Sequence, residues 1–117
     1  MTTARKSPLY EQHLALGGHM APFAGWELPL WYDSAREEHL AVRGRVGLFD
    51  VSHMGQLLVE GPDAEGVVDW LVTGNVRGLG PGEALYTPML NEQGGIVDDL
   101  IVYKRSPKEL FLCVNAA

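Results

Sequence analysis

Three apolar segments in the last third of the chain are separated by turns of only four residues. The segments cover residues 84–90, 95–104 and 109–116, and the turns are Asn91-Glu92-Gln93-Gly94 and Arg105-Ser106-Pro107-Lys108. Turns of this length are short enough for β-hairpins. The pattern therefore predicts three consecutive strands that form an antiparallel meander.

The rest of the chain carries signals for helices and for shorter strands. Residues 34–47 open with a capping box and end at a glycine, and residues 61–74 have a proline in their first turn, so each segment predicts a helix. A short helix or turn at 9–19 and strands at 48–51 and 56–60 complete the expected elements. We therefore expect an α+β fold, in which an antiparallel sheet meander has helices packed on one side.

Composition narrows the class of protein. The 117 residues are 46% hydrophobic and carry a formal net charge of −6, which allows one buried core and argues against nucleic-acid binding. No apolar stretch approaches the roughly 18 residues that span a bilayer, and the first residues lack a targeting signal, so we expect a cytoplasmic protein. The single Cys113 excludes a disulfide framework, and the histidine spacing predicts no metal site. Because an apolar run at 110–114 ends three residues before the last position, we expect a truncated chain.

Residues 20–32 form an apolar segment with a single charge. They include Phe23, Trp26 and Trp31, together with two prolines and a glycine that exclude a regular helix. We therefore expect a loop. The loop either packs its aromatic side chains over the chain's own core, or it lines a ligand site or a contact with another domain.

Asp98 and Asp99 lie in the middle of the strongest predicted strand, where aspartate is disfavoured. Adjacent strand residues point to opposite faces, and both faces of this strand are otherwise apolar. At least one carboxylate is therefore expected in a partly desolvated position. Two explanations remain open: a structural ion pair or edge-strand position, and a carboxylate that meets a substrate.

Other residues that could take part in chemistry lie in two segments, 50–53 and 113–115. Asp50, Ser52 and His53 place an acid, a hydroxyl and an imidazole within four positions, but they lack the Gly-x-Ser-x-Gly signature and predict a polar loop. Cys113, in an apolar strand, predicts an inert core thiol. Asn115 at the end of that strand predicts either a strand terminator or an amide that binds a flat heterocycle.

Several motifs occur together in the order found in one protein family. They are Phe23-Ala24-Gly25-Trp26, Gly47-Leu48-Phe49-Asp50-Val51-Ser52-His53-Met54-Gly55, Gly94-Gly95-Ile96-Val97-Asp98-Asp99 and Val114-Asn115-Ala116. On these motifs the chain closely resembles the N-terminal portion of the aminomethyltransferases, the T-proteins of the glycine cleavage system. The resemblance spans residues 8–117.

The resemblance implies a three-domain cloverleaf around a cavity that holds tetrahydrofolate, with residues 1–117 as the N-terminal part of the folate-binding domain. It implies that the complete protein transfers a methylene carbon from the aminomethyl group on the lipoyl arm of H-protein to tetrahydrofolate, with release of ammonia. Asp98 matches the key catalytic aspartate of the family. Tyr86 and Asn115 match folate contacts, and Met54 is expected near the pterin. Further folate-binding residues of the family would fall beyond Ala117.

Two alternatives to this function are related folate-binding proteins. One is the folate-binding segment of a sarcosine or dimethylglycine oxidase, and the other is a non-enzymatic folate-binding protein of iron–sulfur maintenance. The intact motifs around Asp50 and Asp98 favour the transferase. Because a cavity shared by three lobes cannot be closed by one, we expect the isolated 117 residues to be inactive. We also expect apolar surface to be exposed around Trp26, Trp31 and the last strand.

Overall fold

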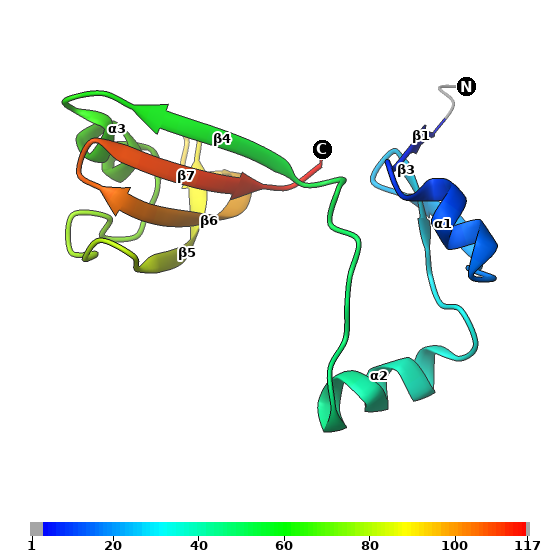
Figure 1. The fold of residues 1–117 in the computed structure, drawn as a ribbon. Helices are drawn as coiled ribbons and strands as arrows, with labels where there is room; N and C mark the ends of the chain where they lie inside the picture. Colours follow the sequence, from blue (N-terminus) through cyan, green and yellow to red (C-terminus); the bar gives the residue numbers. More distant parts are fainter. Residues whose placement is uncertain (1–3, 117) are drawn as a thin grey trace. The chain divides into compact units, whose positions relative to one another are not determined.

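The computed structural model describes residues 4–116, which form two compact units (Figure 1). The N-terminal unit runs to His53, and the C-terminal unit comprises Met54–Asn115. Residues 1–3 and 117 of the predicted domain lie outside the described residues. The helices and strands, in chain order, are β1 (Arg5–Lys6), α1 (Tyr10–Ala15), β2 (Met20–Phe23), β3 (Trp26–Pro29), α2 (Ala35–Gly44), β4 (Gly55–Glu60), α3 (Ala64–Leu71), β5 (Ala84–Leu90), β6 (Ile96–Ser106) and β7 (Glu109–Val114).

The C-terminal unit is built on a four-stranded antiparallel sheet with the strand order β4-β7-β6-β5. Strands β5, β6 and β7 follow one another as hairpins, which confirms the predicted meander. The connection from β4 to β5 contains α3, so β4 is added beside β7 rather than beside β5. The predicted α+β class is confirmed.

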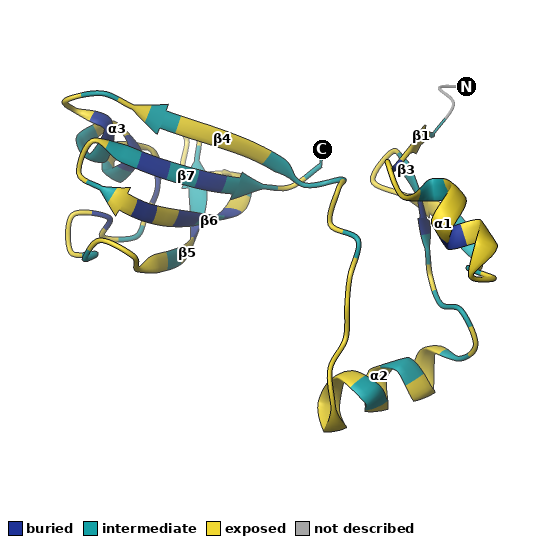
Figure 2. Ribbon diagram, viewed as in Figure 1, coloured by how far each residue is buried: buried dark blue, intermediate teal, exposed yellow. Residues whose placement is uncertain are grey.

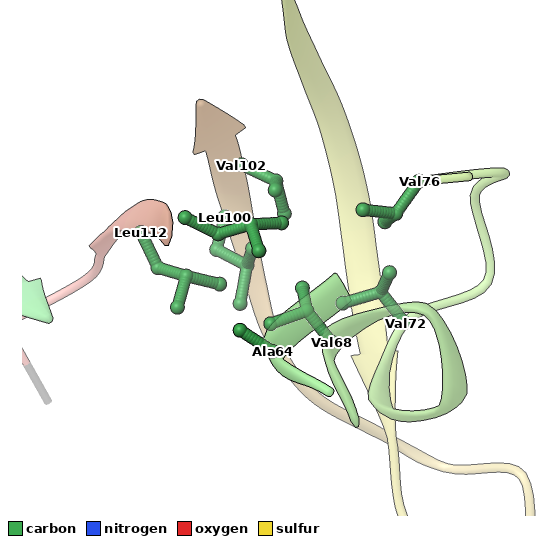
Figure 3. Packing of buried hydrophobic residues seen from close by; sticks show 8 residues of the cluster. Ala64, Val68, Val72, Val76, Leu100, Val102 and Leu112 are labelled. Atoms are coloured by element: carbon green, nitrogen blue, oxygen red, sulfur yellow. The ribbon is translucent and has the colours of Figure 1, made fainter. Parts of the chain in front are cut away.

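Helix α3 covers one face of this sheet because its apolar residues recur at helical spacing. Ala64, Val68 and Val72 are four residues apart and face the strands from one side (Figure 3). Burial of each valine or leucine in such a cluster contributes about 1.5–3 kcal/mol. The buried cluster, in which no residue is more than 7% exposed, consists of Ala64, Val68, Val72, Val76, Leu100, Val102, Leu110 and Leu112.

A buried lysine joins this core to the helix. Lys104 lies on the α3 side of β6, and its side chain is 4% exposed. Its ammonium group donates to a carboxylate oxygen of Glu65 at 2.9 Å and to the carbonyl oxygen of Leu79 at 2.6 Å. A buried charge is tolerated only when it is paired and hydrogen-bonded in this way. Lys104 therefore connects β6 both to α3 and to the segment that follows the helix.

In the N-terminal unit, residues 20–29 form a hairpin instead of the predicted loop. Strands β2 and β3 pair antiparallel, and β1 adds to β3 in a parallel direction. Ala24 and Gly25 occupy the turn with φ of 46° and 79°, a left-handed pair that suits a two-residue hairpin turn. Prolines are compatible with these strands because Pro22 lies on the edge strand and Pro29 is the last residue of β3.

Helix α2 begins at its predicted cap and ends early. The Ser34 side chain accepts a hydrogen bond from the backbone N–H of Glu37 at 3.4 Å, which confirms the N-cap, and the helix ends at Gly44. No residue of α2 is buried, as Figure 2 shows. The strand predicted at 48–51 is wrong: these residues pair with no strand in the described part of the chain, and Leu48 is fully exposed. An apolar run forms a strand only where a neighbouring edge is available to it.

Within residues 4–116, no helix combines the length and the apolar composition that a transmembrane span requires.

Candidate functional site

Tyr86, Asp98, Asp99 and Asn115 meet at one end of the sheet in the C-terminal unit. Leu100 and Val102 of β6 point toward α3, so the alternating residues Asp99 and Ile101 point to the opposite face, which we call the open face. Ile101 is paired with Tyr86 on β5 and with Cys113 on β7. The strand register therefore brings Tyr86, Asp99 and the chain just after β7 to one end of the open face.

Asn115 holds the two aspartates together. Its side-chain amide donates to Asp98 Oδ1 at 2.8 Å and to Asp99 Oδ1 at 2.9 Å, and also to the carbonyl oxygen of Asp99 at 2.8 Å. Its backbone N–H donates to Asp98 Oδ2 at 3.1 Å. One side-chain nitrogen thus bridges both carboxylates. Asn115 therefore not only follows the end of β7 but also holds Asp98 and Asp99 in position.

Tyr86 completes the cluster from the neighbouring strand. Its hydroxyl donates to Asp99 Oδ2 in a short hydrogen bond. This hydrogen bond, together with the negative charge of Asp99, raises the pKa of Tyr86 above its ordinary value. The phenol therefore stays a neutral donor at neutral pH.

The two carboxylates differ in exposure. Asp98 is half-buried and shares the α3 side of β6 with Leu100, whereas Asp99 is exposed on the open face. The prediction that at least one carboxylate is partly desolvated is confirmed by Asp98. A β-bulge at Val97 directly precedes Asp98, because Asp98 pairs with Met89 whereas Ile96 pairs with Leu90. Bulges of this kind are frequent beside functional sites, where they redirect side chains.

Neither a structural ion pair nor an edge-strand position, the two structural explanations for Asp98 and Asp99, applies to this pair. Strand β6 lies inside the sheet between β7 and β5, so Asp98 and Asp99 are not on an edge strand. Among residues 4–116, neither carboxylate forms a salt bridge with a lysine, arginine or histidine. The cluster combines two carboxylates with one amide and one phenol. Such a set favours a ligand that carries positive charge or several N–H donors.

Met54 lies at the same end of the sheet. It immediately precedes β4, whose first residue Gly55 pairs with Val114, and it is half-buried. The register thus brings Met54 level with Asn115. No hydrogen bond in the described part of the chain joins Met54 to the aspartates, and its placement is consistent with an apolar wall beside them.

Asp50 belongs to a separate, buried cluster within the N-terminal unit. Its side chain is 4% exposed and accepts hydrogen bonds from Ser7 Oγ at 2.6 Å and from the backbone N–H of Ser52 at 2.9 Å. His13 Nε2 lies 2.7 Å from the same carboxylate. Burial by itself raises the pKa of Asp50, but the hydrogen bonds from Ser52, Ser7 and His13 outweigh it and hold the pKa well below its ordinary range.

This cluster lacks the geometry of a catalytic triad. The carboxylate contacts both Ser7 and His13, and the second ring nitrogen of His13 is hydrogen-bonded to the hydroxyl of Tyr32 at 2.7 Å. No nitrogen of His13 is left to accept a proton from a serine. The predicted polar loop is confirmed at Ser52, whereas no sequence pattern indicates the distant partners Ser7 and His13.

Cys113 is not the core thiol predicted from the sequence. It is half-exposed and pairs with Ile101 on the open face, because Leu110 and Leu112 occupy the α3 side of β7. Residues 110–114 are apolar at every position, so alternation in the sequence cannot show whether the odd-numbered or the even-numbered residues face the core. Among the described residues there is no group of three histidine, cysteine or acidic side chains arranged to hold a metal ion.

Comparisons with known proteins agree on one family. Residues 9–117 match the family model described as the GCVT N-terminal domain. The chain is 56% identical to the aminomethyltransferase of Thermotoga sp. (strain RQ2) and 48% identical to that of Lysinibacillus sphaericus (strain C3-41), in each case over 97% of this chain and 31% of the relative. The crystal structure of glycine cleavage system aminomethyltransferase T from Bartonella henselae matches with a TM-score of 0.90 and 39% identity, over 96% of this chain and 31% of that one. The chain thus spans about a third of the length of these relatives.

Proposed function

The chain belongs to the aminomethyltransferase family, whose GCVT N-terminal domain it matches, and from this premise we propose the function of the complete protein. It transfers the methylene carbon of an aminomethyl group from the lipoylated H-protein of the glycine cleavage system to tetrahydrofolate, and it releases ammonia. We place this activity in the cytoplasm. The relatives named above are all aminomethyltransferases, which favours this function over the oxidase segment and the iron–sulfur protein.

The observation that carries the proposal is the pair of carboxylates bridged by Asn115. A pterin offers N–H donors along its edge, and the acceptors of Asp98 and Asp99 together with the side chains of Asn115 and Tyr86 fit such an edge. In this proposal Tyr86 and Asn115 contact the folate. Met54 supplies an apolar contact to the pterin.

The reaction requires negative charge beside the reacting carbon. A folate nitrogen attacks the carbon of the aminomethyl thioether, the carbon–nitrogen bond to the leaving ammonia breaks, and a second folate nitrogen then displaces the lipoyl sulfur. Two N–H protons leave the folate, one to the ammonia and one to the lipoyl thiol. Positive charge develops during both displacements, and a fixed carboxylate stabilises it and accepts a proton in transit.

We assign this role to Asp98, which is half-buried and therefore acts through a medium of lower dielectric than water. Asp99 is the second candidate, because it is exposed on the open face and binds the hydroxyl of Tyr86. The two assignments lead to different results when each carboxylate is neutralised separately.

The test uses Asp98→Asn and Asp99→Asn in the complete enzyme, with Glu92→Gln in the exposed turn before β6 as the control. We expect Asp98→Asn to lower kcat by about 10²–10³-fold, the usual effect of removing one stabilising group, with a modest change in folate affinity. A larger loss in Asp99→Asn would transfer the role to Asp99. Near-normal turnover in both variants would refute the site.

The isolated 117 residues are expected to bind tetrahydrofolate weakly or not at all. Helix α2 buries no residue, and Leu48 and Phe49 are exposed, so the chain presents apolar surface that a complete fold would cover. Isothermal titration of this chain with tetrahydrofolate tests the expectation. Micromolar affinity would contradict it.

A further inference from the structure

The carboxylate cluster, which consists of Tyr86, Asp98, Asp99 and Asn115, uses up its own hydrogen-bonding hydrogens. The carboxamide nitrogen of Asn115 has two hydrogens but faces three acceptors, which are Asp98 Oδ1, Asp99 Oδ1 and the carbonyl oxygen of Asp99, all within 2.9 Å. The single hydrogen of the Tyr86 hydroxyl is donated to Asp99 Oδ2. The backbone N–H groups of Asp99 and Asn115 donate to Asp98 at 3.0 and 3.1 Å. None of these groups retains a hydrogen for a ligand.

The two carboxylates fix the orientation of the Asn115 side chain. A carboxylate accepts hydrogen bonds and cannot donate them, so only the nitrogen end of the carboxamide can face Asp98 and Asp99. If the carboxamide turned over, its oxygen would lie against three other oxygens, and their negative charges would repel it. Oδ1 of Asn115 is therefore left over as an acceptor, and among residues 4–116 it forms no hydrogen bond.

Asp99 fixes the hydroxyl of Tyr86 in the same way. The hydrogen of the phenol lies on the side of Asp99, so the lone pairs of its oxygen are what remains for a ligand. Tyr86 is 67% exposed, so a ligand can reach this oxygen. Rotation of the hydrogen toward a ligand would break a hydrogen bond to a charged acceptor, which is about twice as strong as a neutral one.

We propose that Asp98 and Asp99 set the hydrogen-bonding polarity of Asn115 and Tyr86, so that the cluster presents only acceptors to its ligand. Asparagine and tyrosine normally offer both donors and acceptors, and here the aspartates take up the donors. Both aspartates are thus positioning residues for ligand recognition, in addition to the charge that they bring to the reaction.

The consequence is a preference for a reduced pterin, and it rests on the proposed function, because the ligand is taken to be a folate. The proposed reaction takes place at folate nitrogens, so the cluster meets the part of the pterin whose hydrogens depend on its oxidation state. Tetrahydrofolate carries hydrogens on both nitrogens of its reduced ring, dihydrofolate carries one, and folate carries none. Folate therefore places lone pairs against those of Asn115 and Tyr86. A site whose polar groups are left unpaired by the wrong ligand discriminates strongly against it.

Equilibrium binding of the three folates to the complete enzyme tests the proposal without relying on turnover. We expect the dissociation constant to rise from tetrahydrofolate to dihydrofolate to folate, by at least about 100-fold in total. The control variant is Glu92→Gln, which removes one negative charge from the exposed turn before β6 and should leave all three constants unchanged. This series needs no substitution within the cluster.

Asp99→Asn separates the polarity of the cluster from damage to the site. The new carboxamide keeps its oxygen toward the amide of Asn115 and therefore turns its nitrogen toward Tyr86. The Tyr86 oxygen then accepts this hydrogen bond and directs its own hydrogen to the ligand. We expect folate to bind about 10-fold more tightly than in the unsubstituted enzyme, and tetrahydrofolate to bind more weakly. A damaged site does not gain affinity for folate. The addition of Tyr86→Phe removes the new donor and should cancel the gain.

Equal affinity for folate and tetrahydrofolate in the unsubstituted enzyme would overturn the proposal. So would a loss of folate affinity in Asp99→Asn that circular dichroism shows to be folded, or a gain that survives the addition of Tyr86→Phe. In each of these cases tetrahydrofolate still binds to the unsubstituted enzyme, and the proposed function stands. Absence of tetrahydrofolate binding to the unsubstituted enzyme would overturn the proposed function and this specificity together.

Discussion

Replacement of Lys104 by methionine should destabilise the C-terminal unit strongly, although the new side chain is apolar and of similar length. Lys104 has three acceptors around its ammonium group: the Glu65 carboxylate at 2.9 Å, the Leu79 carbonyl at 2.6 Å and the Val76 carbonyl at 3.4 Å. The lysine side chain is 4% exposed. Methionine fills the same space but donates no hydrogen bond, so the Glu65 carboxylate and the Leu79 carbonyl lose this donor, whereas the Val76 carbonyl still accepts from the backbone N–H of Leu79 at 3.1 Å.

The magnitude follows from the surroundings of each acceptor. A buried carbonyl that loses its donor costs about 1–3 kcal/mol, and the half-buried Leu79 carbonyl, which has the close contact with Lys104, falls within this range. Glu65 retains 21% exposure of its side chain, so water solvates its charge and the penalty stays below the roughly 3–5 kcal/mol of a fully buried broken pair. Methionine regains about 1 kcal/mol through apolar burial. The net expected loss is about 2–4 kcal/mol of unfolding free energy.

Urea unfolding followed by circular dichroism measures this loss, with Lys108→Met in the exposed turn before β7 as the control. The control is expected to change stability by less than about 0.5 kcal/mol, as surface substitutions usually do. A Lys104→Met variant as stable as the control would refute the reasoning. It would mean that the ion pair contributes no more than a methionine packed in its place.

Two further predictions concern titration. The pKa of Asp50 is lowered in the native protein, so the native N-terminal unit binds a proton at this carboxylate less readily than the unfolded chain does. The stabilisation that Asp50 contributes is therefore present above about pH 4 and is lost as the pH falls below that value. Asp50→Asn should flatten the fall in unfolding free energy at acid pH, measured by circular dichroism, and an unchanged fall would contradict this. Asp99→Asn should lower the pKa of Tyr86 toward its ordinary value, because the hydrogen bond and the charge that raise this pKa are reduced. Phenolate absorbance measures the pKa, and Tyr86→Phe identifies the signal of this residue. A pKa that does not change in Asp99→Asn would contradict the explanation.

Much of the fold was readable in the sequence because the relevant signals are local. The hairpin turns at 91–94 and 105–108 predicted the meander, and the Ser34 cap predicted the start of α2. The prediction of a loop at 20–29 is wrong, because these residues form a hairpin in spite of their two prolines. Prolines exclude a helix, but not an edge strand or the last residue of a strand.

The candidate site was readable only in part. Two aspartates in an apolar strand were conspicuous by composition, and the motifs around them identified the family. The sequence could not show that Asn115 bridges both carboxylates or that Tyr86 binds Asp99. These partners are 13 to 17 positions apart in the chain and meet only through strand register.

What the sequence determined by itself, then, is the set of strands, the family and the presence of two unusual charges. The tertiary structure decided which face each side chain occupies. Strands β6 and β7 are apolar at both parities, so alternation does not identify the core side, and Cys113 lies on the open face whereas Lys104 lies in the core. The position of α3 resolves the choice, because the face that a helix covers is set by packing between segments distant in the chain.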